Sequence, residues 1–270
     1  YWDNLSNSAV TTINTEFQSD ENLLSDAASE TVVIDQETTE NLLTKTNEAF
    51  NTEINDILLA TMGLAFGEVF GIDQVLLNLE GHGRNNLEGA ETIDISRTVG
   101  WFTINYPVLI DLDQRADLSK YIVQTKEMLR NVPNKGMGSG LSRYRADDHV
   151  NAANPQISFN YLGQFDTDFE QEEFSVSGLS TGSNFSMRSE RFHELSINSL
   201  VVEGQLKFTV EYSKKQFSAG KIATVTDRIK WHLEQIIHHC SGQQQTITPI
   251  DFTADGLSFD DLVEISSLLS

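Results

Sequence analysis

The chain has 270 residues, of which 39% are hydrophobic, so it can form a sizeable core. A formal net charge of −22 argues against non-specific binding to nucleic acid or to anionic membranes, both of which need basic surfaces. The longest apolar runs are too short to span a bilayer. The single cysteine, Cys240, excludes an internal disulfide and favours the reducing cytoplasm. The N-terminus lacks the features of a secretory signal and resembles the interior of a longer chain.

The first 30 residues are polar and acidic, and we predict loop with short extended pieces there. From residue 31 the apolar periodicity predicts strands and helices. In chain order these are strand 31–34, a helix after Asp35 to about residue 50, helix 53–70, strands 74–79 and 103–112, helix 118–129, strand 157–162, a hairpin of 195–202 with 205–212, and helix 218–239. This mixture predicts an α/β sandwich.

Local signals mark several boundaries of these elements. Asp35 is a helix cap, Gly71 is a helix C-cap, and Glu203-Gly204 is the hairpin turn. The glycines of residues 136–140 predict a loop with positive φ angles. We expect a polar segment over 1–30, the folded unit over 31–242, and a linker with an acidic amphipathic tail over 243–270.

Glu80 is the strongest candidate for chemistry. It follows a buried strand and begins the sequence Glu80-Gly81-His82-Gly83-Arg84. A carboxyl group at the mouth of a strand loses solvation, which raises its pKa toward the range useful for proton transfer. The alternative is an ion pair of Glu80 with Arg84 or Arg97 that holds the loop in place.

His82 lies two residues from Glu80, so an extended chain places both side chains on one face. This spacing suits an acid and base pair. The flanking glycines indicate a tight bend and favour the other interpretation, in which His82 shapes the loop by bonding to a backbone group.

Asn160 and Tyr161 are polar positions in an otherwise apolar strand, and alternation allows only one of them to face the same cavity directly. A tyrosine hydroxyl suits a developing enolate oxygen, although a core tyrosine bonded to the backbone is the commoner case.

Other candidates are weaker. His238-His239 ends a predicted helix, where we expect it to act as a helix-end cation. Cys240 is expected to be a structural, partly buried cysteine. The sequence shows no metal-ligand spacing and no nucleotide-binding glycine motif, so we expect neither a metal nor a bound cofactor.

Four ordered motifs carry a family resemblance. Glu80–Arg84 is similar to the first five positions of EGHGRE, with Asn85 in place of an acid. Residues 97–103, including Arg97 and Trp101, with 106–108, resemble RTVGWFT…YPV. Residues 133–140 resemble PxxGxGYG with Ser139 in place of the aromatic, and 159–163 read FNYLG. Together they resemble the epimerization domains of non-ribosomal peptide synthetases, which belong to the condensation superfamily and serve peptide-antibiotic biosynthesis.

The resemblance implies a chloramphenicol-acetyltransferase-like two-layer α/β sandwich, as the second, C-terminal subdomain of a V-shaped domain. It implies interconversion of L and D configuration at Cα of an aminoacyl or peptidyl thioester, carried on the 4′-phosphopantetheine of a carrier domain. Glu80 would be one acid/base, with Asn160 and Tyr161 near it. His82, Arg84, Arg97, Trp101 and Ser139 would shape the loop or contact the pantetheine.

The family's HHxxxDG motif is not found in the sequence, because Gln243 follows His238-His239 at the aspartate position. We therefore expect that this chain needs the first subdomain of the same epimerization domain, besides carrier and neighbouring synthetase domains, and is inactive alone. A condensation domain that forms peptide bonds and a non-catalytic docking module of a synthetase are the alternatives.

Overall fold

The computed structural model describes residues 1–7, 12–19, 21–84, 94–140, 154–165, 179, 182, 184–243, 245–246 and 248–251. A six-stranded mixed sheet forms its centre, in the strand order β1-β6-β5-β4-β2-β3. The strands are β1 (Ala27–Val33), β2 (Gln74–Gly81), β3 (Ile104–Asp111), β4 (Ile157–Gln164), β5 (Leu195–Val202) and β6 (Gln205–Ser213). Strand β4 runs parallel to both its neighbours, β2 and β5, and the other pairs are antiparallel.

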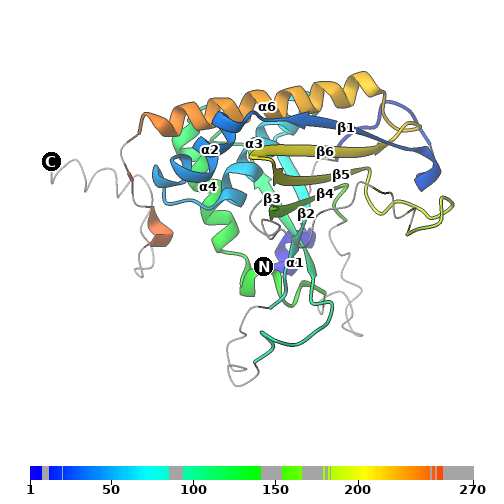
Figure 1. Ribbon diagram of the computed structural model, residues 1–270, viewed down its shortest axis with the longest axis horizontal. Coiled ribbons are helices and arrows are strands. Elements are labelled where there is room, and N and C mark those ends of the chain that lie inside the picture. Colours follow the sequence, from blue (N-terminus) through cyan, green and yellow to red (C-terminus); the bar gives the residue numbers. More distant parts are fainter. Residues whose placement is uncertain are drawn as a thin grey trace.

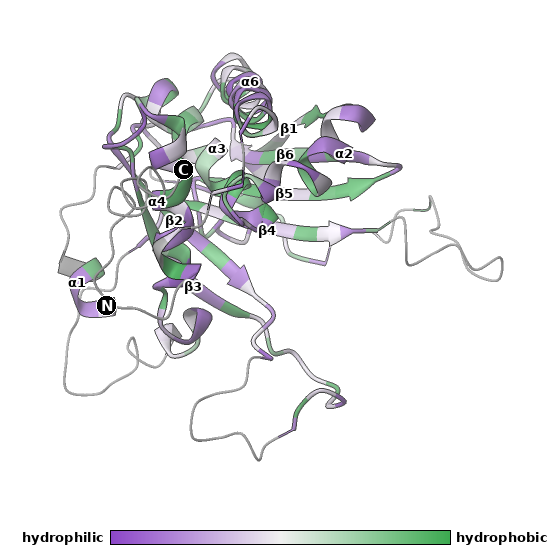
Figure 2. Ribbon diagram, turned by 90° about the vertical axis from the view of Figure 1, so that its left-hand side faces the viewer, coloured by the Kyte–Doolittle hydropathy of each residue, from purple (hydrophilic) through white to green (hydrophobic). Residues whose placement is uncertain are grey.

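Helices pack on one face of this sheet and complete the two layers (Figure 1). The helices of this layer are α2 (Gln36–Thr44), α3 (Ile54–Phe70), α4 (Leu118–Arg130) and α6 (Ala219–Ser241). The short helix α1 (Trp2–Asn7) lies apart from this layer (Figures 1 and 2). Four 3-10 turns complete the elements: η1 (Leu24–Asp26), η2 (Thr46–Glu48), η3 (Pro133–Gly136) and η4 (Pro249–Asp251). Helix α6 runs along the sheet beside β1, and α3 packs against α6. No helix in the described ranges is both long and apolar enough to cross a membrane.

Alternation along the strands separates the two faces of the sheet. In β2, Val75, Leu77 and Leu79 are buried beneath the helices, whereas Asn78 and Glu80 point to the opposite face. The helix-covered face therefore carries the core, and the open face is polar.

Most predicted boundaries agree with the structure. Asp35 caps α2 by accepting a hydrogen bond from Thr38 N–H at 2.9 Å. Gly71 ends α3 with φ of 67°, and Glu203 and Gly204, with φ of 54° and 68°, form the hairpin turn. Gly136 and Gly138 have the positive φ angles that were predicted, 91° and 99°.

Two expectations were wrong in extent. Helix α2 ends at Thr44, because Thr46 Oγ1 and Asn47 Nδ2 donate hydrogen bonds to the carbonyl oxygens of Asn41 and Leu42 and compete with the helical bonds. Strand β1 begins at Ala27, before the predicted start, since pairing with β6 extends over its whole length. The N-terminal 30 residues also include α1 and η1, and the predicted tail helix lies outside the described residues.

The end of α6 holds a buried cysteine and two histidines. Cys240 is 2% exposed, and burial raises the pKa of its thiol to about 12, so it is not a thiolate nucleophile at neutral pH. The ring of His239 stacks on Phe50, and its Nε2 lies 2.8 Å from Ser119 Oγ. His238 and His239 lie in the last turn of the helix, which confirms the predicted position.

Candidate functional site

The site forms where two central strands separate. β2 and β4 pair only between Leu77–Leu79 and Ile157–Phe159. Beyond these residues β2 continues with β3, while β4 continues with β5. Figures 1 and 2 show β2 and β3 diverging from the remaining strands. We call this opening the β2–β4 fork.

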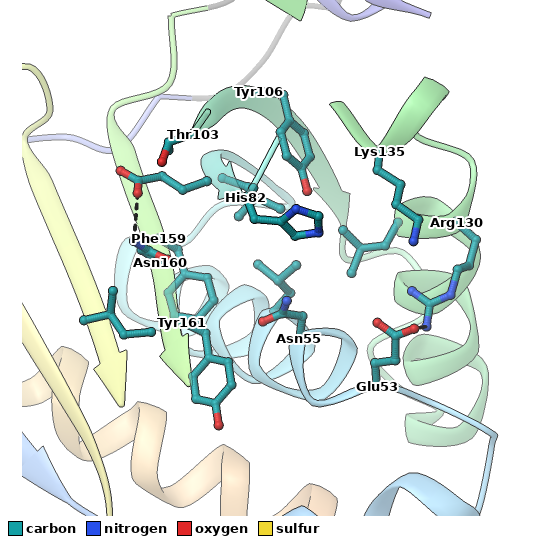
Figure 3. A pocket seen from close by; sticks show the side chains of 16 residues that line it. Glu53, Asn55, His82, Thr103, Tyr106, Arg130, Lys135, Phe159, Asn160 and Tyr161 are labelled. Atoms are coloured by element: carbon teal, nitrogen blue, oxygen red, sulfur yellow. Dashed lines mark hydrogen bonds and ion pairs between the residues drawn. The ribbon is translucent and has the colours of Figure 1, made fainter. Parts of the chain in front are cut away.

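Glu80 and Asn160 lie on the two sides of the β2–β4 fork. Each is the first residue after the last paired position, Leu79 with Phe159. Asn160 Nδ2 donates a hydrogen bond of 2.7 Å to Glu80 Oε2 across the opening (dashed line in Figure 3). The amide therefore fixes the direction of the carboxylate, and hydrogen bonds to charged groups are the stronger kind.

The expectation that Glu80 loses solvation in this chain was wrong. Its side chain is exposed, because the strands diverge at this point and no described element covers the opening. The carboxylate is thus oriented by Asn160 but accessible to a ligand.

Arg84 holds the β2–β3 connection together through its guanidinium group. It donates hydrogen bonds to the carbonyl oxygens of Ile95 at 2.6 Å and Thr98 at 2.8 Å, and lies 4.2 Å from the ring centre of Phe102. Within the described ranges, neither Arg84 nor Arg97 forms an ion pair with Glu80. The loop is therefore stabilised by Arg84 without using the carboxylate.

His82 and Gly83 set the local bend after β2. His82 Nδ1 accepts a hydrogen bond of 3.0 Å from the backbone N–H of Arg84. Gly83 has a φ of 64°, and a Cβ atom there would overlap the carbonyl oxygen of Phe102. The Nδ1 atom of His82 is thus occupied by a backbone N–H, as expected if this histidine shapes the loop.

A cavity of about 550 Å³ lies at the β2–β4 fork, between the sheet and the ends of α3 and α4. Of the predicted site residues, Glu80, His82, Asn160 and Tyr161 line it (Figure 3). The other four predicted residues are not among the described residues that line this cavity: Arg84, Arg97, Trp101 and Ser139. Trp101 is 90% exposed, whereas Ser139 is buried. The structure thus brings together four of the eight predicted residues.

Tyr161 lines the same cavity as Asn160, so the expectation that only one of the two would face it was wrong. The cavity lies where the strands separate, and Tyr161 reaches it from the other face of β4. Alternation puts Asn160 beside Glu80 and turns Tyr161 toward the core, where the ring packs against buried hydrophobic residues. Burial raises the pKa of its hydroxyl, so the group is a protonated donor at neutral pH.

The opposite wall holds residues that the sequence analysis did not assign to the site. Arg130 donates hydrogen bonds to Asp56 Oδ1 and Oδ2 at 3.0 and 2.8 Å, and lies 3.4 Å from Glu53 Oε1. Burial raises the pKa of Asp56, opposed by the Glu53 N–H and by Arg130. Lys135 lies beside Arg130, and its place within the 133–140 motif was the signal for it.

Glu80 also lines a second cavity, of about 730 Å³, on the open face of the sheet. Uncharged polar side chains such as Asn78, Asn105, Ser158 and Asn198 form much of its floor. Glu80 therefore lies between two cavities. No group of three His, Cys, Asp or Glu side chains in the described part of the chain is placed to hold a metal ion.

Comparisons with known proteins place this chain in a family. The sequence matches the condensation domain family over residues 1–255. The chain belongs to the condensation-domain family, and its fold is the two-layer α/β sandwich of that family.

Several peptide synthetases are similar to the chain. It is 44% identical to bacitracin synthase 3 of Bacillus licheniformis, across 86% of this chain and 4% of that protein. It is 40% identical to gramicidin S synthase 1 of Brevibacillus brevis, across 87% of this chain and 22% of that protein. The chain thus spans a small part of these relatives.

Among solved structures, the epimerization domain from the third module of tyrocidine synthetase B superposes with a TM-score of 0.82. The two are 37% identical, across 89% of this chain and 55% of that one. A four-domain nonribosomal peptide synthetase bound to AMP and glycine gives a TM-score of 0.63 at 14% identity, across 96% of this chain and 20% of that one, which is a likeness of fold alone.

Proposed function

We propose that this chain is part of an epimerization domain of a non-ribosomal peptide synthetase. Its substrate would be an aminoacyl or peptidyl thioester on the 4′-phosphopantetheine arm of a carrier domain in the cytoplasm. The observation that carries the proposal is an accessible carboxylate, Glu80, oriented by Asn160 at the junction of two cavities. The resemblance to an epimerization domain at 37% identity supports the choice of reaction.

Epimerization needs a base close to Cα, because the neighbouring thioester carbonyl makes the Cα proton acidic. Glu80 would take the proton from Cα, and the electron pair of the broken C–H bond would move toward the thioester carbonyl to give an enolate. Return of a proton to the other face of Cα would invert the centre. A protonated hydroxyl such as that of Tyr161 is the type of donor that stabilises an enolate oxygen.

Inversion needs a second acid/base on the opposite face of Cα. The 270 residues hold no HHxxxDG motif, and Glu80 is the acidic side chain that faces both cavities. We therefore assign the second group to another subdomain of the same epimerization domain, which would cover the β2–β4 fork and exclude water.

The test is wash-in of deuterium at Cα of a carrier-bound aminoacyl thioester, using the complete epimerization domain. Glu80→Gln keeps the hydrogen bond geometry of the side chain but removes the base, so exchange should fall by about 100-fold or more. Glu40→Gln, an exposed change on α2 that lines neither cavity, is the matched control. Unchanged exchange in the Glu80 variant, with folding intact, would refute the proposal.

The same protein preparations distinguish epimerization from two alternative functions. The family match by itself suits a condensation domain, which would form a peptide product detectable by mass spectrometry. A docking module would be favoured by a Glu80 held in a fixed ion pair. The exposed carboxylate at a cavity, with no ion pair to the described loop arginines, does not support that alternative.

A further inference from the structure

The cavity at the β2–β4 fork has a cation on the wall opposite Asn160. Lys135 lines this cavity and is exposed, and Figure 3 places it beside Arg130 and across from Asn160. The ammonium group thus lies on one wall and the Glu80 carboxylate on the other. A ligand that spans the cavity would contact both.

Lys135 differs from Arg130 in its charge partners. Arg130 is neutralised by the bidentate contact with Asp56 and by Glu53. No described side chain forms an ion pair or hydrogen bond with the Lys135 ammonium group. Among the described residues Lys135 is therefore a cation that lines the cavity without a charge partner, and such a group attracts an anion.

The backbone holds Lys135 in an unusual conformation. Asn134 and Lys135 have φ of 49° and 52°, which non-glycine residues adopt at a cost of about 1–2 kcal/mol each. Gly136 follows with φ of 91°, packed so closely on the ring of Tyr106 that a Cβ atom there would overlap the ring. Tyr106 lines the same cavity, so the turn is fixed against its wall. Strain of this kind is typical of turns that position a functional side chain.

We propose that Lys135 binds the phosphodiester group of the phosphopantetheine arm at the entrance of this cavity. This inference rests on the proposed function and adds the residue that recognises the arm. A lysine ammonium suits a phosphate as a compact charge that needs no fixed fork geometry. The phosphate would lie at Lys135 while the arm extends across the cavity, so that its thioester end approaches Glu80.

Two small probes test the phosphate contact directly. Titration calorimetry at low salt would compare 4′-phosphopantetheine with pantetheine, which lacks the phosphate, on the complete epimerization domain. We expect the wild type to bind the phosphorylated probe about fivefold more tightly. Lys135→Gln should abolish this preference, whereas Lys135→Arg should keep it. Lys214→Gln, at an exposed lysine that lines neither cavity, should also keep it.

The same variants separate this inference from the proposed function. With carrier-bound substrate, Lys135→Gln should raise KM about fivefold and leave kcat unchanged, because the contact is equal in ground and transition states. A phosphate preference that persists in Lys135→Gln, or that the wild type lacks, would overturn the inference even if exchange depends on Glu80. A preference that depends on Lys135, with exchange independent of Glu80, would keep the anion site and remove the epimerase assignment.

Discussion

At the scale of single residues, the site depends on atoms that fix the direction of Glu80 and the bend that follows it. Asn160 orients the carboxylate across the β2–β4 fork, and His82 accepts the Arg84 N–H in the turn. Each contact is local to the fork, so a change in one side chain should act on the site without altering the core.

Gly83 offers a test of the bend. Gly83→Ala should destabilise the protein by about 1–3 kcal/mol, because its φ is positive and the added Cβ would overlap the Phe102 carbonyl oxygen. Gly220→Ala, in the exposed first turn of α6 with open space around it, should be neutral or stabilising. Urea unfolding measures both, and equal stability of the two variants would contradict a strained bend.

At the scale of elements, a buried lysine ties the end of the fold to the helical layer. Lys126 of α4 is 1% exposed and donates hydrogen bonds to Phe50 O, Thr248 Oγ1 and both carboxylate oxygens of Asp251. Asn51 Nδ2 also donates to Asp251. The η4 turn is therefore fixed against the start of α3 and the side of α4.

Lys126→Met should lower the free energy of unfolding by about 2 kcal/mol. Removing one partner of a buried pair is costly, although the Asp251 side chain keeps 15% exposure and regains some water. Arg115→Met removes an exposed ion pair with Asp73 and serves as the control, for which little change is expected. A loss no larger than that of the control would show that the η4 turn is not anchored by Lys126.

The pH dependence of this anchor has a defined sign. Burial raises the pKa of Asp251, but hydrogen bonds from Lys126, Thr248 and Asn51 outweigh it and hold the pKa below the ordinary value near 3.8. Around and below pH 4 the folded state therefore binds fewer protons than the unfolded state. The stabilisation by this carboxylate is lost as pH falls below about 4. In urea titrations, the stability difference between wild type and Asp251→Asn should shrink between pH 6 and pH 3. A constant difference would contradict the lowered pKa.

At the scale of the whole molecule, one hydrophobic core joins the sheet to the helical layer. Its buried residues extend from Ile13 to Cys240 and include side chains of every strand from β2 to β6. A continuous core of this kind favours cooperative unfolding.

The 270-residue chain by itself should therefore fold but not epimerize. Circular dichroism at 222 nm and tryptophan fluorescence should give one coincident urea transition. The carrier-bound thioester should keep its configuration at Cα, because Glu80 offers proton transfer on one face alone, and chiral chromatography of the released amino acid measures this. Inversion at Cα by this polypeptide alone would disprove the need for a second subdomain.

The sequence by itself determined the family and most of the elements from residue 31 onward. Apolar periodicity and caps such as Asp35, Gly71 and Gly204 are local properties, so they could be predicted without the fold. The four motifs indicated the family, because their order along the chain needs no spatial information. The same motifs made Glu80 the candidate acid/base, with Asn160 and Tyr161 as candidates for the residues near it.

Only the tertiary structure decided which of these residues meet. The contact of Glu80 with Asn160 arises where β2 and β4 stop pairing, and a register between strands separated by some 80 positions is not encoded locally. The tertiary structure also decided three further features: Glu80 is exposed, Arg84 bonds within its own loop, and Lys135 lies on the facing wall. Each depends on packing between distant segments, which periodicity and motifs do not specify.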